Sequence, residues 1–95
     1  MLSHEIICEK IKTIVSDFPI KKVSYFGSYA DGTATDASDL DVLVEFETSA
    51  ISLLILLDIK YRLEEKMGIS VDIVHAPIPA GSLIEISKTI PVYAA

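Results

Sequence analysis

Apolar residues recur along the first part of the chain at the spacing of one helical face. They are Ile7, Ile11, Ile14, Val15 and Phe18. This spacing predicts an amphipathic helix that begins near residue 3 and is ended by Pro19, because proline cannot donate the next helical hydrogen bond. Residues 21–26 are rich in β-formers and stop at Gly27, so we expect a short strand there.

Apolar and other residues alternate over positions 39–46. One face carries Leu40, Val42, Val44 and Phe46, and the other carries Asp39, Asp41, Leu43 and Glu45. Successive side chains of a strand point to opposite faces, so this pattern predicts a strand with one buried side. Beyond it we expect a helix over residues 50–67 capped by Gly68, a strand over 70–76, a helix over roughly 80–88 and an edge strand over 91–93.

The order of these elements is helix, strand, strand, helix, strand, helix. It indicates an α/β (α+β) fold in which a small mixed β-sheet has helices packed on one face. The 95 residues contain no repeat, low-complexity tract or linker. We therefore expect one domain over residues 1–95, too small to include a second substrate-holding domain.

The strand at 39–46 also carries candidate catalytic residues. Asp39 and Asp41 are two residues apart, so their carboxylates point to one side, about 6.6 Å apart along the strand. Asp72 lies in a later strand and would fall beside them if the two strands are neighbours, about 4.8 Å apart. Mg²⁺ suits such a site, because it takes carboxylate oxygens and shares its other positions with substrate phosphates. Asp39, Asp41 and Asp72 are thus candidate catalytic and metal-binding residues.

Gly27 and Ser28, at the end of the preceding strand, are candidate nucleotide-binding residues. Glycine lets the backbone approach a phosphate without a Cβ clash, and the amides of a following helical turn and the serine hydroxyl donate to the anion. A calcium loop is the alternative for the acids, but the order of Asp36, Asp39 and Asp41 does not follow the Asp-x-Asp-x-Asp-Gly pattern.

Composition limits the partners. The chain has 8 basic and 14 acidic residues and a formal net charge of −6, which opposes binding of a nucleic-acid backbone. The longest apolar run, residues 53–57, is far shorter than the roughly 20 residues of a membrane-spanning helix. Cys8 has no cysteine to pair with, and the N-terminus has no secretory pattern, so we expect a cytoplasmic protein with no nucleic-acid or membrane partner.

The combined pattern of Gly27-Ser28 followed by Asp39-Leu40-Asp41 and then Asp72 resembles the nucleotidyltransferase superfamily typified by DNA polymerase beta, and within it the minimal nucleotidyltransferases. The resemblance implies that the glycine and serine hold a nucleoside triphosphate such as ATP, that the first two acids bind Mg²⁺ and that the third helps to activate the incoming hydroxyl. Proteins of this group commonly have arginine directly before the second glycine of the turn. Here Asp31 precedes Gly32, which places a negative charge near the expected triphosphate.

The helix expected at 50–67 has a surplus of apolar residues. Positions 51–59 are apolar nearly all round the helix, whereas a helix that covers a sheet needs only one apolar stripe. Some of this surface is therefore expected to contact another chain or a second copy. The charged run 64–66 is interpreted as the solvated end of the same helix.

Minimal nucleotidyltransferases resemble this chain in being small domains that act beside a helical HEPN-type partner as the antitoxin of a toxin–antitoxin pair. The resemblance implies transfer of a nucleoside monophosphate, AMP from ATP above all, to a hydroxyl of that partner. An alternative is a non-catalytic module of the same fold that neutralises its partner by occlusion, favoured by Asp31 and the acidic composition. An aminoglycoside-modifying enzyme is a third possibility, although those enzymes usually carry a further substrate domain.

Overall fold

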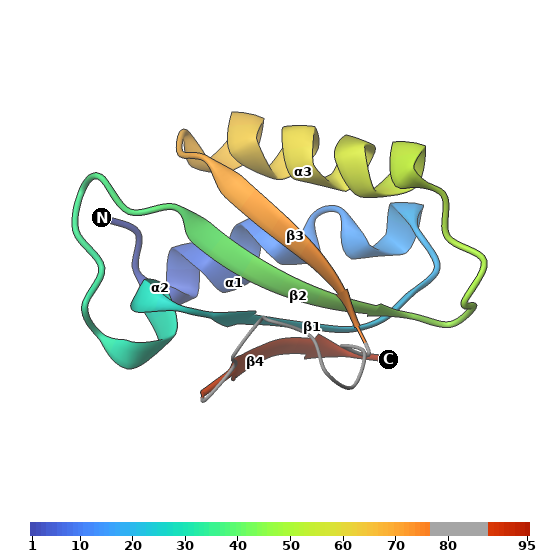
Figure 1. Ribbon diagram of the computed structural model, residues 1–95, viewed down its shortest axis with the longest axis horizontal. Coiled ribbons are helices and arrows are strands. Elements are labelled where there is room, and N and C mark those ends of the chain that lie inside the picture. The colour runs from blue at the N-terminus through green and yellow to red at the C-terminus, as the bar shows by residue number, and fades with distance from the viewer. Residues whose placement is uncertain (77–87) are drawn as a thin grey trace.

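A mixed β-sheet forms the centre of the protein. The computed structural model describes residues 1–76 and 88–95, and in these residues the strand order is β3-β2-β1-β4. The strands are β1 (Ile20–Phe26), β2 (Leu40–Phe46), β3 (Val71–Ala76) and β4 (Ile90–Ala94). β1 is antiparallel to both β2 and β4, whereas β2 and β3 are parallel, with α3 as the crossover between them (Figure 1).

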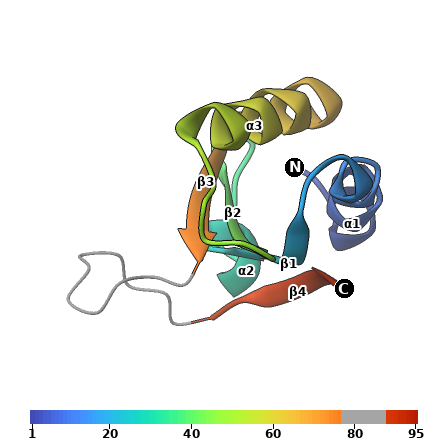
Figure 2. The same cartoon turned by 90° about the vertical axis from the view of Figure 1, so that its right-hand side faces the viewer.

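Two helices cover one face of this sheet. They are α1 (His4–Lys12) and α3 (Leu53–Met67), and Figure 2 shows both on the same side, with the opposite face left without a long helix among the described residues. α2 (Ser28–Asp31) is a single turn at the end of β1. The prediction of a small mixed sheet with helices packed on one face is confirmed. Across the described ranges, no helix has the length and apolar character needed to cross a membrane.

The core lies between the sheet and these two helices. β2 contributes the buried face that its alternation predicts, and α1 and α3 contribute one apolar stripe each. The largest fully buried side chains are Ile7, Ile11, Ile14, Leu40, Ile59, Leu63, Val42, Val44 and Val71. Tyr25 of β1 is also buried, and its hydroxyl lies 2.8 Å from Nδ1 of His4, so the polar end of this core residue has a partner.

Both helices are shorter than their apolar patterns predict. α1 ends at Lys12, because the β-branched run Thr13, Ile14, Val15 disfavours helix, and a 3-10 turn (Val15–Asp17) continues toward Pro19. α3 begins after Ser52, whose side chain accepts from the amide of Ile55 at 3.4 Å and caps the helix. Its other end is the predicted one.

The C-terminal residues form the expected edge strand. β4 pairs with β1 alone in the described sheet and contains Pro91, which an edge position tolerates because it has no amide hydrogen to donate. The helix predicted at residues 80–88 falls outside the described residues, except for Lys88.

Candidate nucleotide and metal site

The acids of the site come from two neighbouring parallel strands. Asp41 of β2 is the register partner of Asp72 of β3, so the two carboxylates lie side by side on the face opposite α1 and α3. This confirms the expected strand neighbourhood. Asp39 immediately precedes β2 and is exposed. The parallel crossover therefore places two of the three predicted acids in direct lateral contact, with the third at the strand entrance.

Electrostatics shows that these acids act on one another. Burial raises the pKa of Asp41, and the carboxylates of Asp72 and Asp39 raise it further, because a second negative charge disfavours ionisation. The carboxylate oxygens form a hard donor set that fits Mg²⁺. However, in residues 1–76 and 88–95 no three His, Cys, Asp or Glu side chains converge closely enough as they stand to hold an ion.

Gly27 lies directly against Asp41. It follows Phe26, the register partner of Asp41 on β1, and has φ +72°. A Cβ at this position would overlap a carboxylate oxygen of Asp41, so any other residue would displace the acid as well as strain the backbone. The turn that is expected to hold phosphate therefore packs directly against Asp41 through Gly27.

Ser28 begins α2, the one-turn helix that the sequence predicts after Gly27. The amides of Ala30 and Asp31 donate to the carbonyl oxygen of Gly27 at 3.0 and 3.1 Å, and those of Thr33 and Ala34 donate to that of Ser28. These bonds close a compact turn at the end of β1. The Ser28 side chain is half-buried at its start, next to the glycine that contacts Asp41.

Asp31 has a structural role that the sequence does not reveal. Its Oδ1 accepts from the Thr33 amide at 3.0 Å and from the Thr33 hydroxyl at 2.6 Å. These side-chain and backbone hydrogen bonds hold the pKa of Asp31 below its ordinary value. Asp31, where the resemblance leads us to expect arginine, is thus exposed, and its hydrogen bonds to Thr33 stabilise the end of α2.

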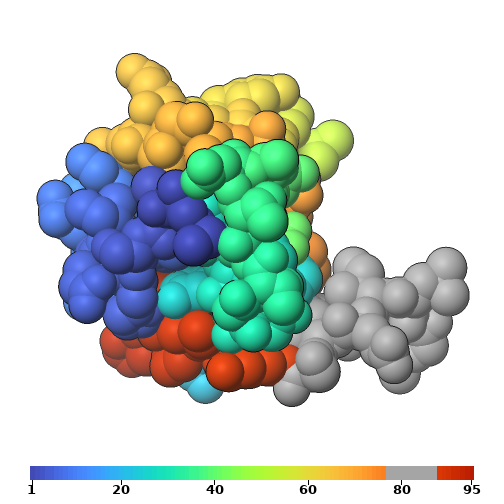
Figure 3. Space-filling view, turned by 90° about the vertical axis from the view of Figure 1, so that its left-hand side faces the viewer, coloured from blue at the N-terminus to red at the C-terminus, as the bar shows by residue number. Residues whose placement is uncertain are grey.

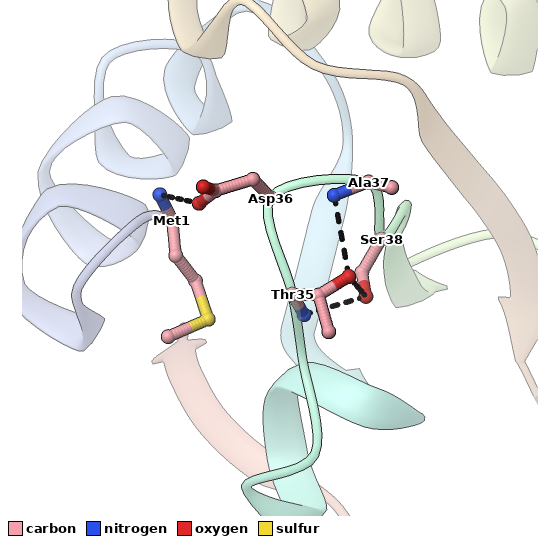
Figure 4. A network of polar contacts seen from close by, with 5 residues as sticks. All are labelled: Met1, Thr35, Asp36, Ala37 and Ser38. Atoms are coloured by element: carbon pink, nitrogen blue, oxygen red, sulfur yellow. Dashed lines mark hydrogen bonds and ion pairs between the residues drawn. The ribbon is translucent and has the colours of Figure 1, made fainter.

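The loop between α2 and β2 is ordered by its own side chains (Figure 4). The amide of Thr35 donates to the Ser38 hydroxyl at 2.8 Å, and the amide of Ala37 donates to the Thr35 hydroxyl at 3.3 Å. Asp36 accepts from the N-terminal ammonium at 3.0 Å, and Figure 3 shows the green loop beside the dark blue N-terminal residues. This turn leads directly into Asp39, the residue before β2.

Two residues of α3 that no sequence motif links to the acids lie next to them in the fold. Lys60 has its ammonium 4.0 Å from Oδ1 of Asp72, and Glu64 accepts from the Val71 amide at 2.9 Å. The interpretation of residues 64–66 as a solvated helix end is therefore wrong for Glu64, which is half-buried against β3. The four-residue spacing of Lys60 and Glu64 is the one sequence signal that could have linked them.

The described cavities lie elsewhere. One of about 220 Å³ is lined by Lys21, Phe46 and His75, among others, at the far end of β2, and a second of about 130 Å³ includes Ser24 and Leu43. Neither is lined by an acid of the site. Asp39 and Asp72 are exposed, so a nucleotide beside them needs the turn and a further surface to enclose it.

Comparison with protein families decides the class. The profile of the family described as nucleotidyltransferase domain matches residues 7–91, which include the turn and all three acids. The chain belongs to this family. It is therefore a nucleotidyltransferase, as the spacing of Gly27-Ser28 and the acids predicts.

Curated relatives of this nucleotidyltransferase are named as protein adenylyltransferases. The candidate protein adenylyltransferase MJ0435 of Methanocaldococcus jannaschii is 45% identical over 67 residues, which are 70% of this chain and 71% of that protein. The protein adenylyltransferase MntA of Thermococcus cleftensis is 38% identical over 63 residues, 66% of this chain and 63% of that protein. The chain is thus similar to enzymes named for modifying proteins.

Solved structures support the fold. A chain of a toxin–antitoxin complex crystallised with AMP-PNP has a TM-score of 0.78 at 20% identity, covering 93% of this chain and 73% of that chain. A chain of the complex between the tri-AMPylated Shewanella oneidensis HEPN toxin and its MNT antitoxin has a TM-score of 0.73 at 16% identity, covering 98% and 74%. The nucleotidyltransferase fold predicted from the sequence is confirmed.

Proposed function

We propose that residues 1–95 act as one nucleotidyltransferase domain that transfers AMP from ATP to a hydroxyl of a protein partner, as the antitoxin of a HEPN-type toxin. The observation that carries this proposal is the packing of Gly27 against Asp41, which is itself in register with Asp72. A phosphate-approaching turn and an acid pair are thereby built into one place. Relatives named as protein adenylyltransferases support the choice of a protein acceptor.

Each site residue has a role in this reaction. Gly27 and Ser28 hold the triphosphate, Asp39 and Asp41 hold Mg²⁺ together with Asp72, and Asp72 also receives the proton of the acceptor hydroxyl. The hydroxyl oxygen bonds to the α-phosphorus while the bond from that phosphorus to the bridging oxygen breaks, and pyrophosphate leaves. When bound, Mg²⁺ neutralises the charge of the phosphate oxygens and of the leaving group.

The sheet face that carries the acids leaves room for an acceptor protein. The acids lie on a sheet face without a long helix among the described residues, so the acceptor can reach Asp72 from solvent. The chain also exposes apolar side chains on α3, with Leu53 and Leu54 at 68% and 77% exposure. We propose that the exposed apolar side chains within residues 51–59 bind the helical partner, or a second copy when no partner is present.

The test uses ATP labelled at the α-phosphate, Mg²⁺, and a HEPN-type helical protein as the acceptor. We expect the label to pass to the partner, and ATP labelled at the γ-phosphate to leave it unlabelled, which separates AMP transfer from phosphorylation. Asp41→Asn and Asp72→Asn should each lower the transfer at least about 100-fold, because each removes a charge that the transition state needs. Glu47→Gln, at the other end of β2, is the matched control and should transfer normally.

The occlusion alternative makes the opposite prediction. If the domain neutralises its partner only by covering it, then Asp41→Asn should neutralise the toxin as well as the unaltered chain does, and no label should move. Growth of cells that express the toxin with either antitoxin variant measures this directly. Full rescue by the Asp41→Asn variant would overturn the catalytic proposal and leave the interface standing.

A further inference from the structure

The C-terminal half of α3 binds the outer edge of β3. β3 is an outer strand of the described sheet. The amide of Val71 donates to Oε2 of Glu64, and the carbonyl oxygen of Val71 accepts from Nζ of Lys60. These two side chains satisfy the backbone groups that a neighbouring strand would otherwise pair. They do so at the residue directly before Asp72.

The same ammonium also faces the acid site. Nζ of Lys60 lies 4.0 Å from Oδ1 of Asp72 and 3.1 Å from Oε2 of Glu64. The Lys60 side chain is 28% exposed and that of Asp72 is 59% exposed, so solvent screens the attraction between the two charges in part. Asp72 is in turn the register partner of Asp41. A positive charge thus stands next to a pair of like charges that repel one another.

We propose that Lys60 is the built-in counter-ion of the acid pair and that its ammonium competes with the divalent cation for Asp72. The proposal rests on the proposed function, because it concerns the same acids. The ammonium and a metal ion neutralise the same carboxylates, so each weakens the binding of the other, and by linkage the effect is reciprocal. When Mg²⁺ binds with the substrate, it would therefore replace the Lys60 ammonium as the counter-charge of Asp72.

A purely structural role for Lys60 predicts a different result. If the lysine served only to hold the carbonyl of Val71, its loss would loosen β3 and displace Asp72, and metal binding would weaken. If it is a counter-ion, its loss leaves the acids more negative and metal binding strengthens. The sign of the change in metal affinity therefore separates the two roles.

The first measurement is calorimetric titration of the nucleotide-free protein with Mg²⁺. We expect Lys60→Met to bind Mg²⁺ roughly 3- to 10-fold more tightly than the unaltered protein, the effect of one nearby charge partly screened by solvent. Lys60→Arg, which keeps the charge, and Lys66→Met, which removes an exposed lysine from the same helix, should stay within about 2-fold. Equal or weaker binding by Lys60→Met would overturn the proposal.

The second measurement needs no metal. A double-mutant cycle of Lys60→Met and Asp72→Asn, followed by urea unfolding in the presence of a chelator, gives the coupling between the two charges. The bond from Lys60 to Val71 cancels in this cycle, because Asp72→Asn does not remove it. We expect the double variant to lose less stability than the two single variants lose in sum. Strict additivity would show that Lys60 does not act on Asp72.

The two measurements together separate failure of the proposed function from failure of the counter-ion role of Lys60. If the unaltered chain binds no Mg²⁺ and transfers no AMP while the cycle shows coupling, the proposed function and the competition with Mg²⁺ both fail, and only the charge coupling of Lys60 to Asp72 stands. If Asp41→Asn abolishes Mg²⁺ binding while Lys60→Met leaves it unchanged, the metal site stands and the counter-ion fails.

Discussion

The N-terminal half of α3 is the more apolar in sequence, but the C-terminal half contains the side chains that are most deeply buried. Residues 53–57 are all leucine or isoleucine, yet Leu53 and Leu54 are largely exposed. Residues 59–67 carry six charged or tyrosine side chains, yet Ile59, Leu63 and Met67 are at most 7% exposed. Burial therefore follows the four-residue stripe that faces the sheet and not the local hydropathy. In the apolar half, Ile55 and Leu56 pack against the core while Leu53 and Leu54 stay exposed, and the charged half contributes the fully buried residues.

The largest effect that separates the halves is the cost of truncating a leucine. Leu63→Ala should lower the free energy of unfolding by about 2 to 4 kcal/mol, because it leaves a cavity in the core between α3 and the sheet. Leu54→Ala should change it by no more than about 0.5 kcal/mol, since that side chain is already in solvent. Urea unfolding of both variants measures the contrast. Similar losses of unfolding free energy in Leu63→Ala and Leu54→Ala would show that the two halves of α3 contribute equally to the core.

The next effect concerns the exposed half. Leu54→Glu should weaken the complex with the helical partner at least about 10-fold, because it places a charge in an apolar contact. The matched control is Ile6→Glu, which changes an exposed apolar residue of α1. Affinity is measured by titration of the labelled partner. Undiminished binding by Leu54→Glu, with Ile6→Glu weakened, would move the interface from α3 to α1.

A smaller effect is expected at the acid pair of Asp41 and Asp72, which lies beside the charged half of α3. Burial and the neighbouring carboxylates raise the pKa of Asp41, so its contribution to stability is present at low pH and is lost as pH rises through the raised pKa. Asp41→Asn should therefore raise Tm at neutral pH in the presence of a chelator. Allowing for solvent screening, the rise should be on the order of 2 to 4 °C.

Scanning calorimetry at two pH values tests this expectation. The gain in Tm should be larger at pH 7 than at pH 4, where protonation already relieves the repulsion. Ser24→Ala on the same sheet face is the control, and it should show no such pH dependence. A lower Tm for Asp41→Asn at pH 7 would mean that the ionised carboxylate stabilises the fold.

The smallest expected effect is the pH-dependent contribution of Glu64, in the charged half of α3, to the stability of the fold. Hydrogen bonds from the Val71 amide and the Lys60 ammonium hold the pKa of Glu64 below its ordinary value of 4.5. A lowered pKa means that the stabilisation is present above pH 4.5 and is lost as pH falls through the lowered value. Glu64→Gln should therefore have a lower Tm than the unaltered protein at pH 6, and the gap should narrow below pH 4.5.

The neighbouring variant Glu65→Gln is the matched control for this measurement, because Glu65 is exposed on the same helix. Its Tm should follow that of the unaltered protein across the whole range. A gap for Glu64→Gln that stays constant with pH would show that the charge of Glu64 does not contribute to holding β3.

Most of the strands and the nucleotidyltransferase class follow from the sequence alone. Alternation over residues 39–46 determines β2 and its buried face, because a strand has only two sides. Gly27-Ser28, Asp39, Asp41 and Asp72 identify the family through spacing, since the turn and the acids must lie at the ends of consecutive strands. Gly68, with φ +72°, ends α3 where the sequence predicts, because glycine adopts this backbone without strain.

Tertiary structure alone decides which distant residues meet. The parallel pairing of β2 with β3 determines that Asp72 stands beside Asp41, and the packing of α3 determines that Lys60 reaches both Val71 and Asp72. The exposure of Leu54 is likewise decided by which stripe of α3 faces the sheet. Sequence patterns report the period of a single element, whereas contacts between elements depend on how the whole chain closes its core.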